Sequence, residues 1–315
     1  MFALIKEDYY MFGKSYNFEA HEDVTKLNLS NISILEEKLS GHHTDDSYAR
    51  SPGYYAFTGR KGLWLIQDKN CSVIFCLHPN VDDTILVFPS LGSFNECLAH
   101  KLITMIKGYS LKIEFARLTE PFKFGNLPIT YHVEELLDWK FPIHSYSVQT
   151  LLDMKGRGFR QYRNYVNRCL RDGVTYRLAN VQDSYLEINE FFHSVNLTQE
   201  RDTAEWDTSS KFFLSALLKS HLNIELVVIE KFGKIIGMSV FEKPIKGRKT
   251  ANILMVQTDR SQQGSFEFLY YAVANIMKDF DIEFYCDGGS EYEGLDAFKR
   301  KMQPIQSIQL MTGVL

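Results

Sequence analysis

The sequence predicts an α+β fold built as two similar halves, and three observations lead to this prediction. The chain has 315 residues, which exceeds the usual size of one hydrophobic core and favours two domains. Apolar residues make up 45% of the chain and charged residues 23%, as in ordinary folded proteins. In each half, short predicted strands precede a helix and a further strand. This order is typical of mixed sheets flanked by helices.

The first half is predicted to contain several strands, a helix and a final strand. Gly41–Gly53 follows a mixed helix and loop region and is predicted as an exposed loop. β-Branched and aromatic residues between turn residues then predict four strands, at Tyr54–Thr58, Leu63–Asp68, Ser72–Leu77 and Thr84–Phe88. Leu91–Ile106 is predicted as a helix and Leu111–Arg117 as a strand.

The second half repeats this order with clearer signals. Three helices are predicted first, at Gly158–Leu170, from a cap at Asp183 through Phe192, and at Ser209–Leu218. Gly233 allows a tight hairpin between the first two of three strands, which are Ile224–Ile229, Ile235–Phe241 and Thr250–Gln257. The remaining elements are a helix at Ser265–Asp279, a strand at Ile282–Cys286, a short helix at Leu295–Lys301 and a closing strand at Ile305–Met311. We therefore expect two domains, 1–145 and 146–315.

Composition argues against several classes of protein. The longest apolar runs are far shorter than the roughly 20 residues of a membrane-spanning helix. The N-terminus lacks the features of a secretory signal, so we expect a cytoplasmic protein. The net charge is −4, which gives no global attraction to nucleic acid or anionic lipid, so any such attraction must be local.

Motifs for metal, hydrolase, kinase and dehydrogenase chemistry are missing from the sequence. Its five cysteines contain no CxxC pair, which argues against a zinc site or a disulfide framework. His42, His43, Asp45 and Asp46 lack regular ligand spacing and are expected to be exposed rather than to bind metal. No Gly-x-Ser-x-Gly elbow, P-loop or Rossmann fingerprint is present. We expect no metal and no permanently bound cofactor.

The order of elements resembles the GNAT fold, and three segments sharpen the likeness. Glu225–Phe241 looks like the central GNAT hairpin, and Phe266–Ala274 lies where GNAT folds put the helix that faces the acyl donor. Asp287-Gly-Gly-Ser290, followed by Gly294-Leu-Asp-Ala-Phe-Lys299, resembles the ending of the Fem peptidyltransferases. The catalytic domain of the lysyl-phosphatidylglycerol synthases has a similar ending.

A further segment resembles the same two families. Leu137–Pro142 leads to Met154–Arg168, and in these proteins a basic helix of this kind opens the second half. The resemblance implies two GNAT-like domains in tandem, each a mixed, mostly antiparallel sheet flanked by helices. It also implies transfer of an amino acid from aminoacyl-tRNA to an amine or hydroxyl acceptor, with the reaction centre in the second domain.

The resemblance assigns candidate roles to the Gly-Gly and Phe-Lys segments. Lys299 is carried over as the residue that stabilises an oxyanion or a charged neighbour of the ester. Asp287 would act as a base or as an amine-binding carboxylate, since Gly288 and Gly289 let a substrate approach the backbone closely. Phe298 is assigned to substrate binding. The alternatives are a turn-forming Asp287 and a surface Lys299.

The segment Asp153–Arg177 is strongly basic, with seven Lys or Arg residues against two Asp residues. Helical spacing puts an apolar stripe, Phe159, Tyr162, Val166 and Leu170, on one face. The other face carries Arg160, Arg163, Asn164, Asn167 and Arg171, which we assign to binding an anion such as tRNA or a phosphorylated acceptor. The alternative is an ordinary solvated face.

The loop Asp259–Phe266 occupies the place where a GNAT enzyme holds the pyrophosphate of acetyl-CoA. Such a loop usually reads Gln/Arg-x-x-Gly-x-Gly/Ala, because small residues let the diphosphate reach the amides at a helix N-terminus. Neither register of this loop fits the pattern, so we expect acetyl-CoA to bind poorly. Arg260, Gly264 and Ser265 could still form a variant cofactor-binding loop.

These observations lead to three functional hypotheses. The first is a transferase that uses aminoacyl-tRNA, or an acyl thioester, as co-substrate and a small-molecule, peptide or lipid acceptor. The second is an N-acyltransferase that depends on acyl-CoA or acyl-carrier protein. The third is a GNAT-like binding module without catalysis.

Overall fold

The computed structural model describes residues 16–93, 95–121, 128–133, 140–198, 211–218, 222–290 and 292–315. Contacts divide the chain into two compact units. The first consists of Met1–Pro142 together with Ile308–Leu315, and the second is Ile143–Ser307. The first unit therefore contains both ends of the chain, while the sequence prediction divided the chain once, between residues 145 and 146.

The first unit is built on a mixed sheet that is eight-stranded within the described residues, in the order β1-β2-β3-β4-β6-β15-β7, with β5 paired to β3. The pair β4–β6 is parallel, and the other pairs of described strands are antiparallel. Its strands are β1 (Val24–Leu27), β2 (Leu63–Asp68), β3 (Cys71–Leu77), β4 (Thr84–Val87), β5 (Leu91–Gly92), β6 (Lys112–Leu118), β7 (Thr130–Val133) and β15 (Met311–Val314).

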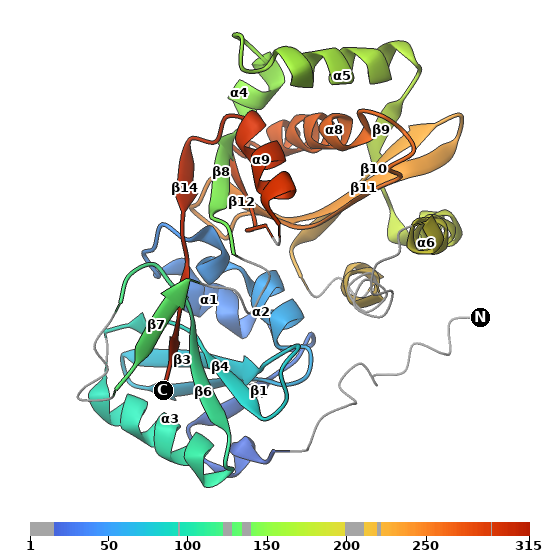
Figure 1. Ribbon diagram of the computed structural model, residues 1–315. Coiled ribbons are helices and arrows are strands. Elements are labelled where there is room, and N and C mark those ends of the chain that lie inside the picture. The colour runs from blue at the N-terminus through green and yellow to red at the C-terminus, as the bar shows by residue number, and fades with distance from the viewer. Residues whose placement is uncertain are drawn as a thin grey trace. The chain divides into compact units, whose positions relative to one another are not determined.

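Helices cover both faces of this sheet. In Figure 1, α3 (Glu96–Gly108) lies below the sheet, and α1 (Ile34–Ser40) and α2 (Pro52–Thr58) lie above it. The side chain of Asn95 starts α3 by accepting hydrogen bonds from the amides of Cys97 and Leu98. Apolar side chains of α3 then pack against the strands in one hydrophobic core.

The prediction of a strand at Tyr54–Thr58 was wrong, because these residues form α2. Aromatic and β-branched side chains favoured a strand, but the residues that precede Tyr54 form a helix cap. The side chain of Ser51 accepts a hydrogen bond from the amide of Tyr54, and Pro52 occupies the first turn. The capping signal therefore outweighs strand propensity here.

The second unit is built on a mixed sheet that is seven-stranded within the described residues, in the order β14-β8-β13-β12-β11-β10-β9. The pair β12–β13 is parallel, and the pairs β8–β13, β11–β12, β10–β11 and β9–β10 are antiparallel. Its strands are β8 (Ile143–Ser147), β9 (Thr175–Leu178), β10 (Ile224–Lys231), β11 (Lys234–Glu242), β12 (Thr250–Thr258), β13 (Phe284–Asp287) and β14 (Gln306–Ile308).

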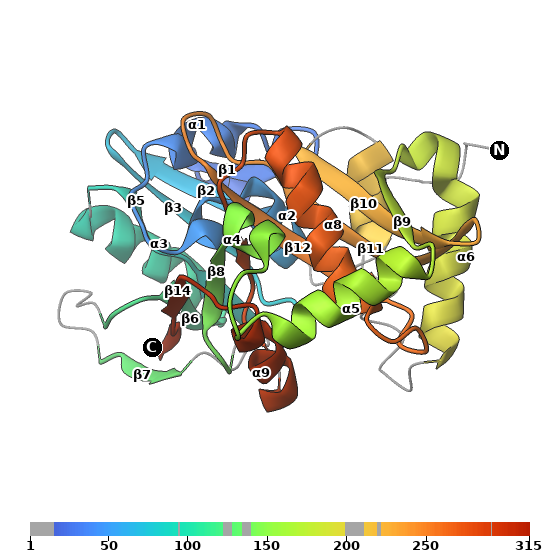
Figure 2. The ribbon, with the colours of Figure 1, turned by 90° about the horizontal axis from the view of Figure 1, so that it is seen from above.

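One face of this sheet is covered by a central helix and its neighbours. Figure 2 shows α8 (Ser265–Asp279) crossing the strands, with α5 (Arg160–Arg171) and α4 (Val148–Asp153) beside it. On the other side lies α6 (Val181–Thr198), seen end-on in Figure 1. Residues 211–218 form a further helix, and α9 (Glu293–Lys301) follows β13. Most predicted elements of this half are confirmed, although Asp183 lies inside α6 rather than at its start.

The strand orders of the two sheets match position by position. In both units a parallel strand pair is joined by one helix, β4–α3–β6 in the first and β12–α8–β13 in the second. The predicted α+β class, with two mixed and mostly antiparallel sheets flanked by helices, is confirmed. Sequence analysis assigned the end of the chain to the second half, whereas β15 lies between β6 and β7 in the first sheet.

Candidate active site

The candidate site lies where the parallel pairing of β12 and β13 in the second unit ends. The short strand β13 pairs with only the first four residues of β12, Thr250–Ile253, and then ends at Asp287, while β12 continues to Thr258. Ligands of open α/β sheets bind beyond the carboxyl ends of such strands. The geometry therefore puts Asp287 at the expected edge of the sheet.

Asp287 and Lys299 form a buried ion pair at this edge. Lys299 Nζ lies 3.2 Å from Asp287 Oδ1, and both side chains are less than 10% exposed. The hydroxyl of Tyr270, on α8, donates to the other carboxylate oxygen of Asp287. Burial, followed by the charge of Asp287, raises the pKa of Tyr270 well above its usual value, so this hydroxyl stays protonated.

Lys299 also fixes the backbone of the Gly-Gly segment. Its ammonium donates to the carbonyl of Gly289 at 2.8 Å and to the carbonyl of Gly288. With Asp287, these contacts use all three ammonium protons. Lys299 therefore holds the loop after β13 in place, and the structure brings Asp287, Gly288, Gly289 and Lys299 together as the sequence predicted.

The next residue, Ser290, supplies an unsatisfied group. Its Oγ is fully buried and has no hydrogen-bond partner among the described residues. A buried hydroxyl without a partner costs free energy, and a bound ligand is one way to satisfy it. Sequence analysis treated Ser290 only as part of the Gly-Gly motif.

Aromatic rings surround the ion pair. The ring of Phe298 lies 4.9 Å from that of Phe266 and 6.0 Å from that of Tyr270, measured between centroids. Tyr146 stacks on Tyr285 at 5.0 Å, and its hydroxyl donates to the carbonyl of Lys299. Phe298 therefore packs beside Asp287's partner Tyr270, which gives the site one apolar wall.

A second polar cluster, which the sequence analysis missed, lies on the neighbouring strand. His144 is the cross-strand partner of Asp287 in β8. Its two ring nitrogens lie 2.8 Å from Asp296 Oδ1 and 2.8 Å from Ser307 Oγ. Burial lowers the pKa of His144 in spite of Asp296, so the imidazole is neutral at pH 7.

Asp296 connects this cluster to α9. Burial opposes its ionisation, but hydrogen bonds from Arg300 and His144 outweigh burial and lower its pKa. The cluster ties α9 to β8 and β14 and so supports the helix that carries Lys299. Asp296 lay inside the Gly-Leu-Asp-Ala-Phe-Lys motif, but nothing local identified His144, which is 152 residues away in the chain.

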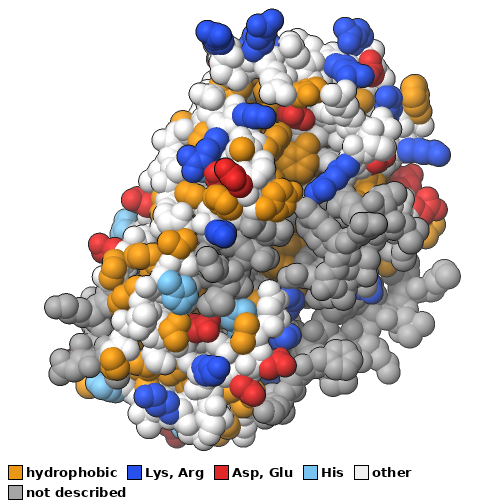
Figure 3. Space-filling view, in the orientation of Figure 1, with side chains coloured by type: hydrophobic (Ala, Val, Ile, Leu, Met, Phe, Trp, Pro, Cys, Tyr) orange, Lys and Arg blue, Asp and Glu red, His pale blue; other side chains and the backbone are white. Residues whose placement is uncertain are grey.

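The basic face of α5 is largely as predicted. Arg160, Asn164 and Asn167 are exposed, and Figure 3 shows Lys and Arg side chains gathered over this part of the second unit. Arg163 differs, because it is half-buried and donates to the carbonyls of Met154 and Gly156. It therefore holds the turn before the helix.

The apolar stripe of α5 differs from the prediction at one position. Phe159, Tyr162 and Val166 are buried, but Leu170 is 46% exposed and Cys169 enters the core instead. A helix of 3.6 residues per turn permits either i+3 or i+4 as the next inward position, and here i+3 faces the core.

The loop before α8 is already bonded within itself. Asp259 Oδ1 accepts a hydrogen bond from the amide of Ser261, and the Asp259 carbonyl accepts one from the amide of Gln262. Gly264 has a φ of +88° at the N-terminus of α8, and a Cβ there would lie 3.1 Å from Tyr165 Cβ of α5. The Asp259 carboxylate thus occupies one backbone amide of this loop, that of Ser261.

The predicted cofactor residues of this loop have different surroundings. Arg260 is exposed, whereas Ser265 is buried and its hydroxyl donates to the carbonyl of Asp259. Arg168 of α5 donates to Gln263 at 2.7 Å, so α5 lies along the loop. These contacts place Gln263 and Gly264 beside the basic helix.

The described residues contain neither a membrane-spanning helix nor a cluster of metal ligands. None of the described helices is long and apolar enough to cross a membrane. Within the same part of the chain, no group of three or more His, Cys, Asp or Glu side chains is arranged to hold a metal ion.

Solved structures with the same overall fold include proteins of the suspected families. A conserved protein of unknown function from Bacteroides thetaiotaomicron has a TM-score of 0.73 at 14% identity, covering 93% of this chain and 99% of that one. L-PGS from Bacillus licheniformis has a TM-score of 0.64 at 13% identity, covering 91% and 92%. FemX has a TM-score of 0.58 at 11% identity, covering 92% and 97%. No family model matches the sequence, and the search of curated proteins found no significant match.

These likenesses define the class of protein at the level of the fold. The chain has the tandem GNAT-like fold that it shares with FemX and with lysylphosphatidylglycerol synthetase domains. The resemblance drawn from the Gly-Gly and Phe-Lys segments is confirmed in this respect.

Proposed function

We propose that this chain is a transferase that moves an aminoacyl group from aminoacyl-tRNA to an amine or hydroxyl acceptor. The observation that carries the proposal is the buried Asp287–Lys299–Tyr270 arrangement at the end of β13. It combines a carboxylate, a fixed cation and a glycine-rich backbone at the edge where a tandem GNAT-like fold leaves room for a donor.

Asp287 is suited to binding the ammonium group of the aminoacyl donor. Its two oxygens already accept from Lys299 and Tyr270, and each oxygen keeps a further lone pair that can accept from a donor ammonium. A bound ammonium would fix the ester carbonyl next to Gly288 and Gly289. The geometry therefore favours the amine-binding role over the role of general base.

In the proposed reaction the nitrogen or oxygen of the acceptor attacks the ester carbonyl. A bond forms from that atom to the carbonyl carbon, and the bond from this carbon to the ribose oxygen breaks. The proton lost by the acceptor ends on the ribose hydroxyl, so no other reactant is needed. The positive charge of Lys299, held close by, would stabilise the negative charge that develops on the carbonyl oxygen.

The choice of donor rests on α5 and the loop before α8. Asp259 already bonds the loop that would meet a diphosphate, which disfavours acyl-CoA. Exposed Arg160 and Arg171 on α5 suit the phosphates of RNA. An acyl thioester remains the alternative donor, since Gly264 keeps the positive φ of a phosphate-binding turn.

The test compares donors and variants in one assay. The protein is incubated with a mixed pool of labelled aminoacyl-tRNA, or with labelled acyl-CoAs, in a cell extract of small molecules and lipids. Products are identified by mass spectrometry. We expect transfer from aminoacyl-tRNA, and a loss of about 100-fold or more for Asp287→Asn because the donor ammonium loses its counter-charge.

Tyr270→Phe should reduce the rate by about tenfold, since only one hydrogen bond to Asp287 is lost. Tyr271→Phe, on the next position of α8, is the matched control and should be unchanged. Transfer from acyl-CoA alone would support the alternative donor. Full activity of Asp287→Asn would contradict the proposed site.

A further inference from the structure

The first unit contains a cavity of about 470 Å³ that the proposed transfer reaction does not use. Residues at the ends of the parallel strands β4 and β6 line it, including Val87 and Phe115, together with Ala99 and Leu102 of α3. The cavity thus occupies the position in the first unit that corresponds to the Asp287 site in the second. Its volume lies within the range of small-molecule sites, about 300 to 1,000 Å³.

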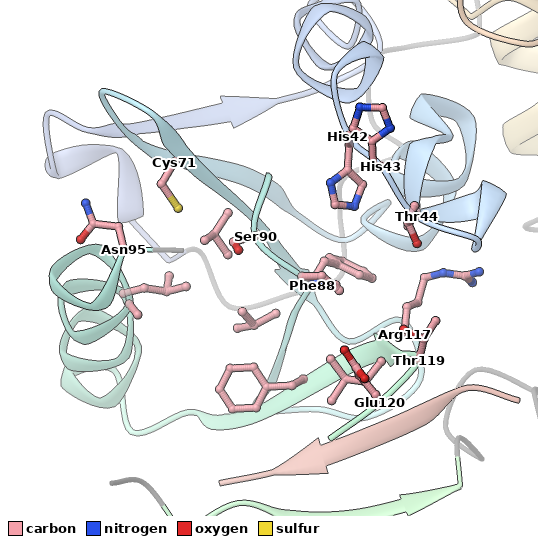
Figure 4. A pocket seen from close by; sticks show the side chains of 18 residues that line it. His42, His43, Thr44, Cys71, Phe88, Ser90, Asn95, Arg117, Thr119 and Glu120 are labelled. Atoms are coloured by element: carbon pink, nitrogen blue, oxygen red, sulfur yellow. The ribbon is translucent and has the colours of Figure 1, made fainter. Parts of the chain in front are cut away.

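Most of the cavity wall is apolar. Buried hydrophobic side chains from three strands and α3 form it, namely Val73, Val87, Phe88, Ala99, Leu102 and Phe115. Figure 4 shows Phe88 between two groups of polar residues. An apolar wall of this kind favours a hydrocarbon or aromatic portion of a ligand, because binding removes that portion from water.

On one side the polar groups are two imidazoles, two threonine hydroxyls and the carboxylate of Glu120. In Figure 4, His42, His43, Thr44, Thr119 and Glu120 lie together near Arg117. Burial, followed by the charge of Arg50, lowers the pKa of His42, so its imidazole is neutral at pH 7. Glu120 adds a carboxylate.

Arg117 does not make this side attractive to anions. Its guanidinium points away from the cavity in Figure 4 and donates to both carboxylate oxygens of Asp46, in a fully buried ion pair. The two charges cancel, and the guanidinium also lies over the rings of Tyr48 and Tyr54. Asp46 had been expected in an exposed loop, but this ion pair buries it.

The opposite side of the cavity is no anion site either. The side-chain oxygen of Asn95 accepts from the amides of Cys97 and Leu98, so these donors at the start of α3 are already used. The side-chain nitrogen Nδ2 of Asn95 donates a hydrogen bond to Asp68 Oδ2 at 2.9 Å, and Asp68 adds negative charge. A phosphorylated ligand therefore finds neither free amides nor an unpaired arginine here.

The backbone at Arg117 is strained where it borders the cavity. Arg117 has a φ of +60°, a conformation that costs a non-glycine residue about 1 kcal/mol or more. The pairing of β6 with β15 shifts register at the same place. Strained residues concentrate at binding sites, which gives a second, independent reason to regard this cavity as built for a ligand.

We propose that the cavity of the first unit binds a small amphiphile with an apolar alkyl or aryl portion and a primary ammonium head. The apolar portion packs against Val87, Leu102 and Phe115, and the ammonium donates toward the carboxylate of Glu120. This site is independent of the proposed transfer reaction, since all of its residues belong to the first unit.

The test uses three probes of equal length on the full chain: hexylamine, hexanol and hexanoate. Isothermal titration calorimetry at pH 7 should give the tightest binding for hexylamine, at least tenfold tighter than for hexanoate. Ala99→Phe fills the cavity from α3 and should weaken hexylamine binding at least tenfold. Thr104→Phe, exposed on the same helix, is the matched control and should bind like the unmodified protein.

Glu120→Gln keeps the proposal falsifiable if Ala99→Phe fails to fold, because Glu120 is exposed and its replacement leaves the core intact. This variant should bind hexylamine and hexanol equally. Hexanoate binding as tightly as hexylamine would overturn the proposal, and so would hexylamine affinity that neither Ala99→Phe nor Glu120→Gln changes. Loss of the transferase activity proposed above would not affect either result.

Discussion

Lys299 and Asp287 show how a residue can serve stability and chemistry together. Both charges are nearly out of reach of solvent, and Lys299 also satisfies the carbonyls of Gly288 and Gly289. Removing one partner of such a pair leaves the other charge buried without compensation, which is strongly destabilising.

Lys299→Met should therefore lower the free energy of unfolding by about 3 kcal/mol. Lys301→Met, on the exposed side of the same helix, should change it by less than about 0.5 kcal/mol. Urea unfolding followed by circular dichroism measures both. Equal stability of the two variants would mean that Lys299 contributes no buried ion pair in solution.

We expect His78 to lower the stability of the first unit in acid. It is 1% exposed, and its Nδ1 accepts hydrogen bonds from the amides of Asn80 and Val81. Burial, followed by the charges of Lys61 and Arg60, lowers the pKa of His78 to about 4. Protonation would convert the accepting nitrogen into a donor that faces two other donors.

The folded pKa of His78 lies below its unfolded value, so its contribution to stability is complete above about pH 6.5. This contribution is lost as pH falls toward 4, and the loss is on the order of 3 kcal/mol. His78→Asn should remove the loss, because an Asn side chain can accept from the same two amides and does not titrate. Thermal unfolding between pH 7 and 4 tests this, with exposed His132→Asn as control. An unchanged pH profile in His78→Asn would contradict the assignment.

At the scale of elements, sequence patterns predicted what local signals encode. The helix Ser265–Asp279 matches α8 in both bounds, and the hairpin around Gly233 is present. The helix α2 was missed because its aromatic residues resemble a strand, whereas a two-residue cap, Ser51 and Pro52, decides the structure.

The residues of the candidate site also differ in whether a local sequence pattern could identify them. Asp287, Gly288 and Gly289 adjoin in the chain, and Lys299 follows within one motif, so a local resemblance was enough to group them. His144 reaches the site only because β8 pairs with β13. Strand pairing across such a separation has no local signature, and neither has the buried hydroxyl of Ser290.

RNA binding by α5 can be tested with substitutions that leave the residues with structural contacts unchanged. Arg160→Glu with Arg171→Glu changes two exposed side chains, whereas Arg163 is left in place because it holds the preceding turn. The pair should weaken tRNA binding about tenfold or more at low salt and reduce the slope of log affinity against log salt by about 2.

The matched control is Lys38→Glu with Lys107→Glu, which makes the same change in net charge on exposed residues of the first unit. Filter binding or fluorescence anisotropy with unmodified tRNA at several salt concentrations gives both quantities. Similar effects in the two double variants would indicate general electrostatics rather than a site on α5.

At the scale of the whole molecule, we expect the strand β15 to be required for the fold of the first unit. β15 pairs with β6 on one side and β7 on the other, so it lies inside the sheet. Deleting Leu310–Leu315 should unfold this region while the second unit keeps its structure, because the second sheet ends with β14.

Hydrogen exchange with mass spectrometry can resolve the two units. In the deletion variant, amides of β6 should lose protection by about two orders of magnitude, while those of β10 and β11 should not change. A synthetic peptide of residues 309–315, added in trans, should restore protection of β6. Normal protection of β6 in the deletion variant would contradict a structural role of β15.

The position of β15 also has a consequence for synthesis on the ribosome. Domains usually fold in the order in which they emerge, the N-terminal one first. Here the first unit cannot close its sheet until β15, which includes Thr312 and Gly313, has left the exit tunnel. The first unit is thus completed only after the whole second unit has been made, and until then β6 and β7 present unpaired edges that favour aggregation.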